Sequence, residues 1–140
     1  FFMEGYLKKK EVPAALSAAT ISTALFLDKP EMRSNSANKF FDSMAAGKPI
    51  MINYGGWMYD LIQSHDCGLA MWGMSFSDVA KELNDKVHDS EWLKIASKAS
   101  LLLAKECFDR DILASQLLGV IECAAQGHPD KSEIIAPGIY

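Results

Sequence analysis

Short apolar segments alternate along the chain with amphipathic segments. Residues 20–27 and 49–54 are rich in apolar residues and end in polar or glycine-containing turns. Residues 37–46, 57–64 and 89–105 instead carry apolar residues at intervals of three and four, which is typical of amphipathic helices. The alternation predicts parallel strands joined by helices. We therefore expect an α/β domain with a Rossmann-like parallel sheet and flanking helices.

Further elements follow the same alternation. We expect additional strands at residues 1–4 and 69–72 and additional helices at residues 12–19, 77–87 and 108–125. The small alanines of the first of these helices suit close packing on the sheet. Ser75 or Ser77 is expected to cap the helix that follows it. Residues 126–140 are rich in glycine, proline and polar residues, which predicts a loose tail.

The stretch from residue 35 to residue 56 carries most of the candidate chemistry. Asn35 or Ser36 is a suitable N-cap for the helix at 37–46, and Gly47 supplies a left-handed C-cap. The apolar run that follows predicts a strand buried on both faces. The residues of this helix that we expect to face the core are Phe40, Phe41, Met44 and Ala45.

The polar face of the same helix predicts anion binding. Asn35, Lys39 and Asp42 share this face. The helix N-terminus offers unpaired N–H groups, and Lys39 adds a full positive charge, so a phosphate group could bind there. Asp42, one turn further along, could accept hydrogen bonds from ribose hydroxyls. The simpler alternative is a capped surface helix with a Lys39–Asp42 pair. Arg33 could also reach a phosphate, but is interpreted as an exposed loop residue.

Composition and charge narrow the choice of function. The 140 residues allow one domain, and a net charge of −4 argues against a nucleic-acid-binding protein. No apolar run is long enough for a membrane-spanning helix. The three cysteines lack CxxC spacing, which argues against a zinc site and favours reduced thiols in a cytoplasmic protein. His65 beside Asp66 is expected at the amino-terminal edge of the sheet, and His88 and His128 are expected in polar turns without a partner motif, so we expect no catalytic triad and no metal cluster.

A known enzyme family shares the central motif. The segment SNSANKFFDSMAAGKPIMINYGGW, residues 34–57, resembles family 4 glycosyltransferases, which are retaining enzymes of the GT-B fold. It is most similar to a bacterial surface-polysaccharide branch in which N-K-F-F-D or N-K-L-F-E precedes A-A-G-K-P. Some members of this branch are assigned to transfer N-acetylfucosamine from a UDP donor. The resemblance extends from residue 1 to about residue 120 and implies the donor-nucleotide-binding, C-terminal domain of such an enzyme.

The resemblance implies specific site residues. Lys39 is the implied catalytic residue, since its charge would stabilise the departing diphosphate, and Asn38 would share the diphosphate contact. The wider family has two acidic residues before the A-A-G turn, and the second, at Asp42 here, binds the donor ribose. The first falls on Ser34, which departs from the family pattern and is kept as a candidate donor-binding residue.

Three glycines complete the implied donor site. In the family, the glycine that corresponds to Gly5 lies near the base of the donor nucleotide; a simple loop between a strand and a helix is the alternative. Gly55 and Gly56 match a G-G-x-x-E-L-I pattern of the family, with Asp60 at the acidic position. The helix after these glycines is expected to begin at the same edge of the sheet as the 35–38 loop, because both follow strand ends.

The implied protein is a retaining, metal-independent glycosyltransferase that moves a sugar from a UDP-sugar to a saccharide acceptor, expected to be lipid-linked. The UDP-sugar is a substrate, so no cofactor is expected. The C-terminal domain of a GT-B enzyme begins with two βα units that we do not find. We therefore expect residues 1–125 to form a partial nucleotide-sugar-binding domain of a larger enzyme, followed by the tail at 126–140. The N-terminal domain of that enzyme is an expected partner, and the chain alone is expected to be inactive.

Alternatives remain open at this point. Exposed strand edges could drive dimerisation of the chain, and a cytoplasmic enzyme of this kind could lie at the inner face of the membrane. A sugar-nucleotide epimerase of the same fold needs catalytic carboxylates and a histidine in its cleft, which Asp42 with His65 does not provide. A non-enzymatic α/β binding module of the response-regulator kind needs an acidic pocket at the strand ends, where only Asp28 and Asn53 stand.

Overall fold

The computed structural model describes residues 5–27 and 29–128, and within them three parallel strands form one sheet in the order β1-β2-β3. The strands are β1 (Ser22–Ala24), β2 (Ile50–Ile52) and β3 (Gly68–Ala70). The register pairs Ser22 with Ile50 and Ile50 with Gly68. The expected α/β class with a parallel sheet and flanking helices is confirmed. The strand expected at residues 1–4 and most of the tail lie outside the described residues.

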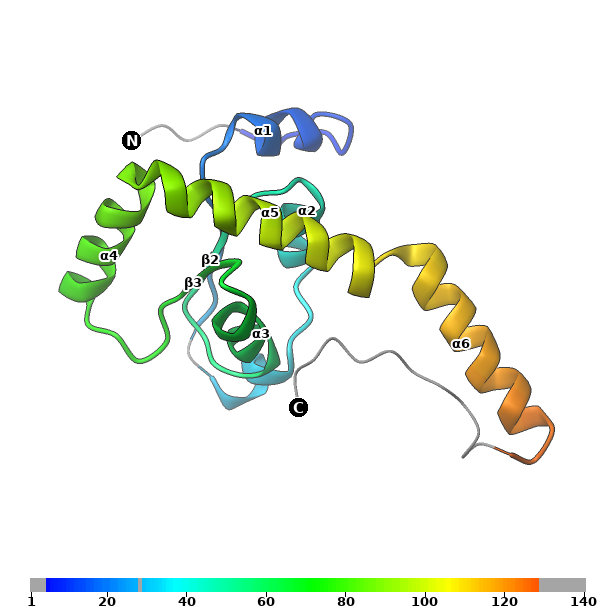
Figure 1. Ribbon diagram of the computed structural model, residues 1–140. Helices are drawn as coiled ribbons and strands as arrows, with labels where there is room; N and C mark the ends of the chain where they lie inside the picture. The colour runs from blue at the N-terminus through cyan, green and yellow to red at the C-terminus, as the bar shows by residue number, and fades with distance from the viewer. Residues whose placement is uncertain (1–4, 28, 129–140) are drawn as a thin grey trace.

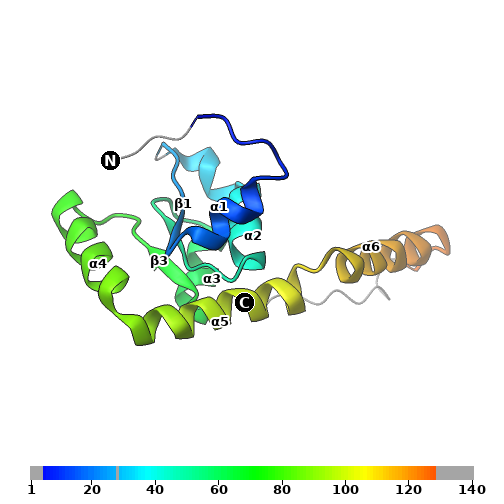
Figure 2. The same cartoon turned by 90° about the horizontal axis from the view of Figure 1, so that it is seen from above.

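Helices connect and flank these strands (Figure 1). They are α1 (Val12–Ala18), the 3-10 helix η1 (Pro30–Ser34), α2 (Asn38–Ala45), α3 (Trp57–His65), α4 (Phe76–His88), α5 (Ser90–Cys107) and α6 (Arg110–Ala125). Helix α5 packs against α2 and α4, and α3 packs against β3. Figures 1 and 2 both show α6 extending away from the sheet. None of the described helices combines the length and the apolar character that a membrane crossing requires.

The central strand β2 is buried on both faces, as its apolar sequence predicts. Ile50 and Ile52 belong to a core cluster that includes Phe40 and Met44 of α2 and Leu61 of α3. On the opposite face, Met51 packs in a second cluster, which also contains Leu69, Met71, Trp92 and Ala96. Helices therefore cover the sheet on both of its faces.

Helix α2 is fixed at its C-terminal end by local hydrogen bonds. Gly47 has a φ of +64°, and its N–H donates to the Met44 carbonyl at 2.9 Å. The Lys48 N–H donates to the Ser43 carbonyl at 2.9 Å, which completes a Schellman motif. The left-handed cap expected at Gly47 is confirmed.

The core face of α2 differs in part from the expectation. Phe40 and Met44 are fully buried and Phe41 is half-buried, but Ala45 is exposed. Ser43 is buried instead, because its hydroxyl lies 2.6 Å from the Lys39 carbonyl oxygen and 2.8 Å from Ser22 Oγ of β1. A small hydroxyl that satisfies its hydrogen bonds can thus take a core position and connect the helix to the sheet.

Helices α4, α5 and α6 begin at side-chain caps. Ser75 accepts a hydrogen bond from the Asp78 N–H, so Ser75 rather than Ser77 is the cap of α4. Asp89 and Asp109 cap α5 and α6 in the same manner. Helix α6 therefore starts at Arg110, slightly later than the start expected at residue 108.

The expectation that α1 packs closely on the sheet is wrong. None of the seven residues of α1 is buried. The reason is that alanines offer little apolar area, and β1, the strand that follows, is only three residues long. A hydrogen bond from Lys48 Nζ to the Ser17 carbonyl, 2.9 Å long, connects α1 to the turn after α2. Helix α6 likewise contains no buried residue.

A matched pair of leucine substitutions tests this division between core and periphery. Leu61 of α3 is fully buried, whereas Leu117 of α6 is 60% exposed. Leu61→Ala is expected to lower the free energy of unfolding by about 2–5 kcal/mol, because it removes apolar contacts and leaves a cavity. Leu117→Ala is expected to change it by no more than about 0.5 kcal/mol. Urea unfolding followed by circular dichroism measures both, and equal losses would contradict the described packing.

Candidate functional site

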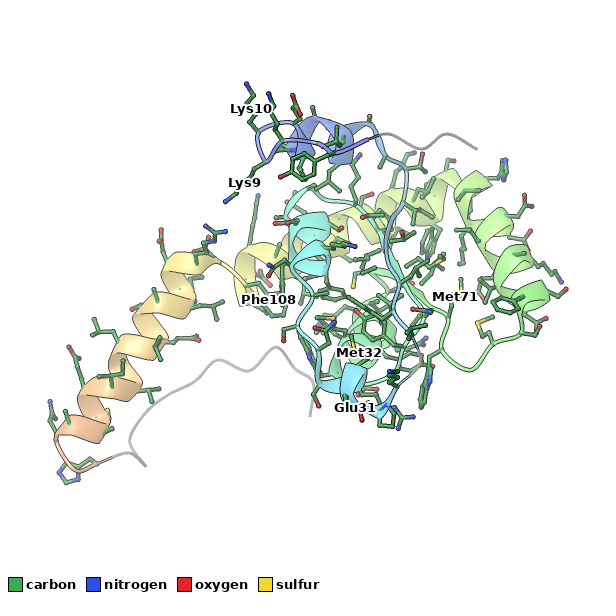
Figure 3. The ribbon with its side chains drawn as sticks, turned by 180° about the vertical axis from the view of Figure 1, so that it is seen from behind. Lys9, Lys10, Glu31, Met32, Met71 and Phe108 are labelled. Carbon is green, nitrogen blue, oxygen red and sulfur yellow. The ribbon has the colours of Figure 1, made fainter. Side chains whose placement is uncertain are left out.

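The candidate site lies at the carboxyl edge of the sheet. Because the three strands are parallel, the segments that follow β1, β2 and β3 all leave from this edge. These segments contain η1, the start of α2 and the start of α3. Figure 3 shows Glu31 and Met32 of η1 at this end of the molecule, with Lys9 and Lys10 at the opposite end. Ligands of open α/β sheets bind at the carboxyl edge.

Two contacts hold η1 against the beginning of α3. The indole Nε1–H of Trp57 donates to the Asn35 carbonyl at 3.0 Å. Gly56, the N-cap of α3, has a φ of +106°, and a Cβ at this position would overlap the Arg33 carbonyl. Only glycine tolerates both this conformation and this approach. The starts of α2 and α3 therefore lie at the same edge, as the sequence predicts.

The missing side chain of Gly55 leaves space that the ring of Trp72 fills. A Cβ on Gly55 would lie 2.8 Å from ring atoms of Trp72, which follows β3. The Arg33 Cζ lies 5.0 Å from the centroid of the same ring, and Tyr59 meets it edge-on at 5.8 Å between centroids. Sequence reasoning missed Trp72, although an aromatic residue at the end of a predicted strand is a usable signal.

The start of α2 differs from the expectation in its cap. Neither Asn35 nor Ser36 caps the helix; Ala37 is the N-cap and no side chain accepts from the first turn. Helix α2 begins at Asn38, one residue later than expected, so the N-cap position falls on Ala37, which has no side-chain acceptor. Helix α3 also lacks a side-chain cap. The first-turn N–H groups of both helices thus remain without side-chain acceptors.

Asn38, Lys39 and Asp42 follow one another along the exposed side of α2. Asn38 and Lys39 lie in the first turn, and Asp42 lies one turn further from the edge. Among the described residues the side-chain ion pair is Lys94–Glu91, so Lys39 and Asp42 do not form the pair of the simpler interpretation.

Asp42 lines two grooves, one on each side of α2. The first groove, of about 550 Å³, lies between Asp42 of α2 and residues of α1 and of the segment before it, namely Lys9, Val12, Pro13, Leu16 and Ser17. A second groove, of about 480 Å³, lies toward Leu101, Lys105 and the start of α6. The first has the size of a small-molecule pocket and combines an apolar lining with one residue of each charge.

The structure brings most of the predicted site residues together, with one exception. Ser34, at the end of η1, joins Asn38, Lys39, Gly55 and Gly56 at the carboxyl edge. Gly5 is not brought there. It belongs to the exposed segment that leads into α1, and Lys9 and Lys10 of the same segment lie at the opposite end of the molecule (Figure 3).

Three polar side chains that could suggest chemistry are structural. The Asn53 side chain pairs with both backbone groups of Phe26, at 2.9 Å each, and so extends the pairing of β1 and β2 beyond their ends. His65 lies at the amino-terminal edge, with Nδ1 3.1 Å from the Leu61 carbonyl, while Asp66 accepts from the Trp92 indole at 3.3 Å. The described residues contain no group of three or more His, Cys, Asp or Glu placed to hold a metal ion.

The best-buried thiol is not available as a nucleophile. Burial raises the pKa of Cys67 to about 11, and the charge of Asp66 adds to the shift. At neutral pH this thiol is therefore protonated, and the thiolate that nucleophilic chemistry needs is scarce. Burial also raises the pKa of the half-buried Cys107.

A thiol-labelling experiment checks this environment. At pH 8 a thiol with a pKa near 11 is only about 0.1% ionised. Iodoacetamide is therefore expected to modify the half-buried Cys123 well before Cys67, and urea should abolish the difference. Mass spectrometry of tryptic peptides measures the order. Labelling of Cys67 at the rate of Cys123 in the folded chain would contradict the described burial.

A glycine pair tests how η1 is held. Gly56→Ala combines backbone strain with overlap against the Arg33 carbonyl, and is expected to cost about 2–5 kcal/mol. Gly73 also has a left-handed φ, +75°, but a Cβ there would meet no atom within 4 Å. Gly73→Ala should therefore cost only the strain, about 1–2 kcal/mol. Urea unfolding compares the two, and equal costs would show that the η1 contact is not close.

Comparisons with known proteins do not identify the chain. No protein-family model, no curated protein and no solved structure matches it. A function therefore has to be inferred from the motif at residues 34–57 and from the geometry of the edge where these residues lie.

Proposed function

We propose that the chain is the donor-nucleotide-binding part of a retaining glycosyltransferase that uses a UDP-sugar. The observation that carries this proposal is the meeting of two uncapped helix N-termini, those of α2 and α3, at the carboxyl edge of a parallel sheet. Helix N-termini bind phosphate through free N–H groups and a partial positive charge. The N-K-F-F-D motif that resembles the glycosyltransferase family supplies the first turn of α2.

Lys39 is the proposed catalytic residue. Its side chain is exposed in the first turn of α2, and it is not neutralised by Asp42. A full positive charge beside the leaving diphosphate would stabilise the charge that develops as the glycosidic bond to the donor breaks. Asn38, its neighbour, can donate an amide hydrogen bond to the same group. In this mechanism catalysis is electrostatic and requires neither a metal nor a base from this chain.

Asp42 is the proposed ribose contact. It lies one turn beyond Lys39, a spacing that places both on the same side of the helix. A nucleotide whose diphosphate meets the start of α2 would then extend along this side, toward the groove between α1 and α2. The groove volume of about 550 Å³ suits a nucleoside. Ser34, Gly55 and Gly56 would line the diphosphate and sugar end, whereas Gly5 does not line the groove.

The acceptor is a saccharide, proposed to be lipid-linked, in bacterial surface-polysaccharide synthesis. In the GT-B arrangement it would bind across the cleft on an N-terminal domain. In the proposed assignment the described residues bind the donor, and complete transfer requires the acceptor-binding domain as well.

Nucleotide titrations of the 140-residue chain test this assignment. Lys39→Ala is expected to weaken UDP binding about tenfold, because a charged hydrogen bond contributes more than about 1.4 kcal/mol. Asp42→Ala should weaken UDP and uridine binding by a similar factor but leave inorganic pyrophosphate binding unchanged. Isothermal titration calorimetry gives the affinities, and protein-observed NMR shows which residues shift.

Lys98→Ala is the matched control, since Lys98 is an exposed lysine of α5 that lines neither groove. It should bind UDP as the unmodified chain does. Absence of UDP binding by a folded chain, or equal binding by the Lys39 and Lys98 variants, would count against the proposal. UDP binding by a full-length protein that transfers no sugar would instead favour a non-enzymatic nucleotide-binding module.

A further inference from the structure

Arg33 is held at the candidate site more firmly than an ordinary loop residue. It lies in the last turn of η1, and its backbone is pressed against Gly56 at the start of α3. Two residues after Arg33, the Asn35 carbonyl accepts a hydrogen bond from the Trp57 indole, which also connects this segment to α3. The backbone of Arg33 therefore has a defined position beside the first turn of α3.

The side chain of Arg33 is positioned by Trp72. Its Cζ lies 5.0 Å from the centroid of the indole ring. The ring itself has little freedom, because it lies directly on Gly55 and against the edge of Tyr59, although 37% of Trp72 remains exposed. An arginine over an aromatic ring uses its π-face and keeps its in-plane N–H groups for planar, two-pronged binding of phosphate oxygens.

Among the described residues, no ion pair occupies this guanidinium. Two carboxylates belong to adjacent turns, Glu31 in η1 and Asp60 in α3. Neither forms an ion pair with Arg33 among the described residues. Lys39 lies at the start of α2, which the Trp57–Asn35 hydrogen bond connects to α3. Arg33 and Lys39 are thus two cations, from separate segments, at the same edge of the sheet.

We propose that Arg33 binds the phosphate oxygens of a nucleoside diphosphate at this edge, and that Trp72 is the positioning residue that holds its guanidinium. The inference rests on the proposed function and specifies its ligand: recognition of the diphosphate depends on Arg33 as well as on Lys39. Gly55 and Gly56 serve this arrangement, because their missing side chains let Trp72 and the Arg33 backbone approach.

Charge-matched variants in the same loop test the role of Arg33. Arg33→Gln is expected to weaken binding of UDP and of inorganic pyrophosphate about tenfold, because a charged two-pronged contact is lost. Uridine, which has no phosphate, should bind unchanged. Lys29→Gln removes the same charge from the N-cap of η1 and should change UDP binding less than twofold. Calorimetric titration of each folded variant with the three ligands gives these ratios.

The role of Trp72 needs a readout that mere destabilisation would not change. Trp72→Leu removes the aromatic surface and is expected to weaken UDP and pyrophosphate binding while uridine binding is retained. Trp72→Phe keeps an aromatic ring and should restore most of the loss. Combining Arg33→Gln with Trp72→Leu should add little to the effect of Arg33→Gln alone, because both act through one contact.

The outcomes separate this inference from the proposed function. If the unmodified chain binds UDP and Lys39→Ala weakens it, but Arg33→Gln binds like Lys29→Gln, the inference about Arg33 is wrong and the proposed function stands. If the folded unmodified chain binds neither UDP nor pyrophosphate, both are wrong. Full binding by Trp72→Leu, with weak binding by Arg33→Gln, would overturn the positioning role of Trp72.

Discussion

The close approach of η1 to the start of α3 is the constraint on which the candidate site depends. Two glycines make it possible: Gly56 accommodates the Arg33 carbonyl, and Gly55 accommodates the ring of Trp72. The Trp57–Asn35 hydrogen bond then fixes the chain just before α2 begins. One short contact region therefore determines where α2 starts and which side chains share the carboxyl edge. A larger residue at either glycine would separate elements that the proposed ligand has to meet together.

The position of α2 is fixed independently at its other end. The Schellman motif at Gly47 reverses the chain into β2, and the Ser43 hydroxyl lies within hydrogen-bond distance of β1. Because β2 is buried on both faces, movement of α2 along the sheet would disturb the core cluster of Phe40 and Ile52. The first turn of α2 therefore offers its N–H groups from a rigid support, which reduces the conformational cost of binding an anion.

Local sequence signals predicted the elements better than the contacts between them. The buried strand β2, the cap at Gly47 and the helix starts near Ser75 and Asp89 all follow from residues that are neighbours in sequence. The topology of parallel strands was enough to bring Ser34, Lys39 and Gly55 to one edge. The cap of α2 was mispredicted because the helix begins one residue later than expected, which puts Ala37 at the N-cap position. Trp72 was not singled out because its contacts with Gly55 and Arg33 join residues that are distant in sequence, and Arg33 was interpreted as an exposed loop residue. Gly5 was assigned from a resemblance, and its segment contains Lys9 and Lys10, which lie at the other end of the molecule.

The net charge of −4 does not prevent the proposed site from binding an anion. At physiological ionic strength charges are screened over about 8 Å, so acidic residues farther than this from the carboxyl edge have little effect there. The groups proposed to meet the ligand are the N–H groups of two helix starts, Lys39, and the guanidinium that lies over Trp72. Glu31 and Asp60 oppose them, but neither forms an ion pair with Arg33 in the described part of the chain. In the proposed site a diphosphate would be favoured over a single carboxylate, because it carries more negative oxygens with which to engage cations from two segments.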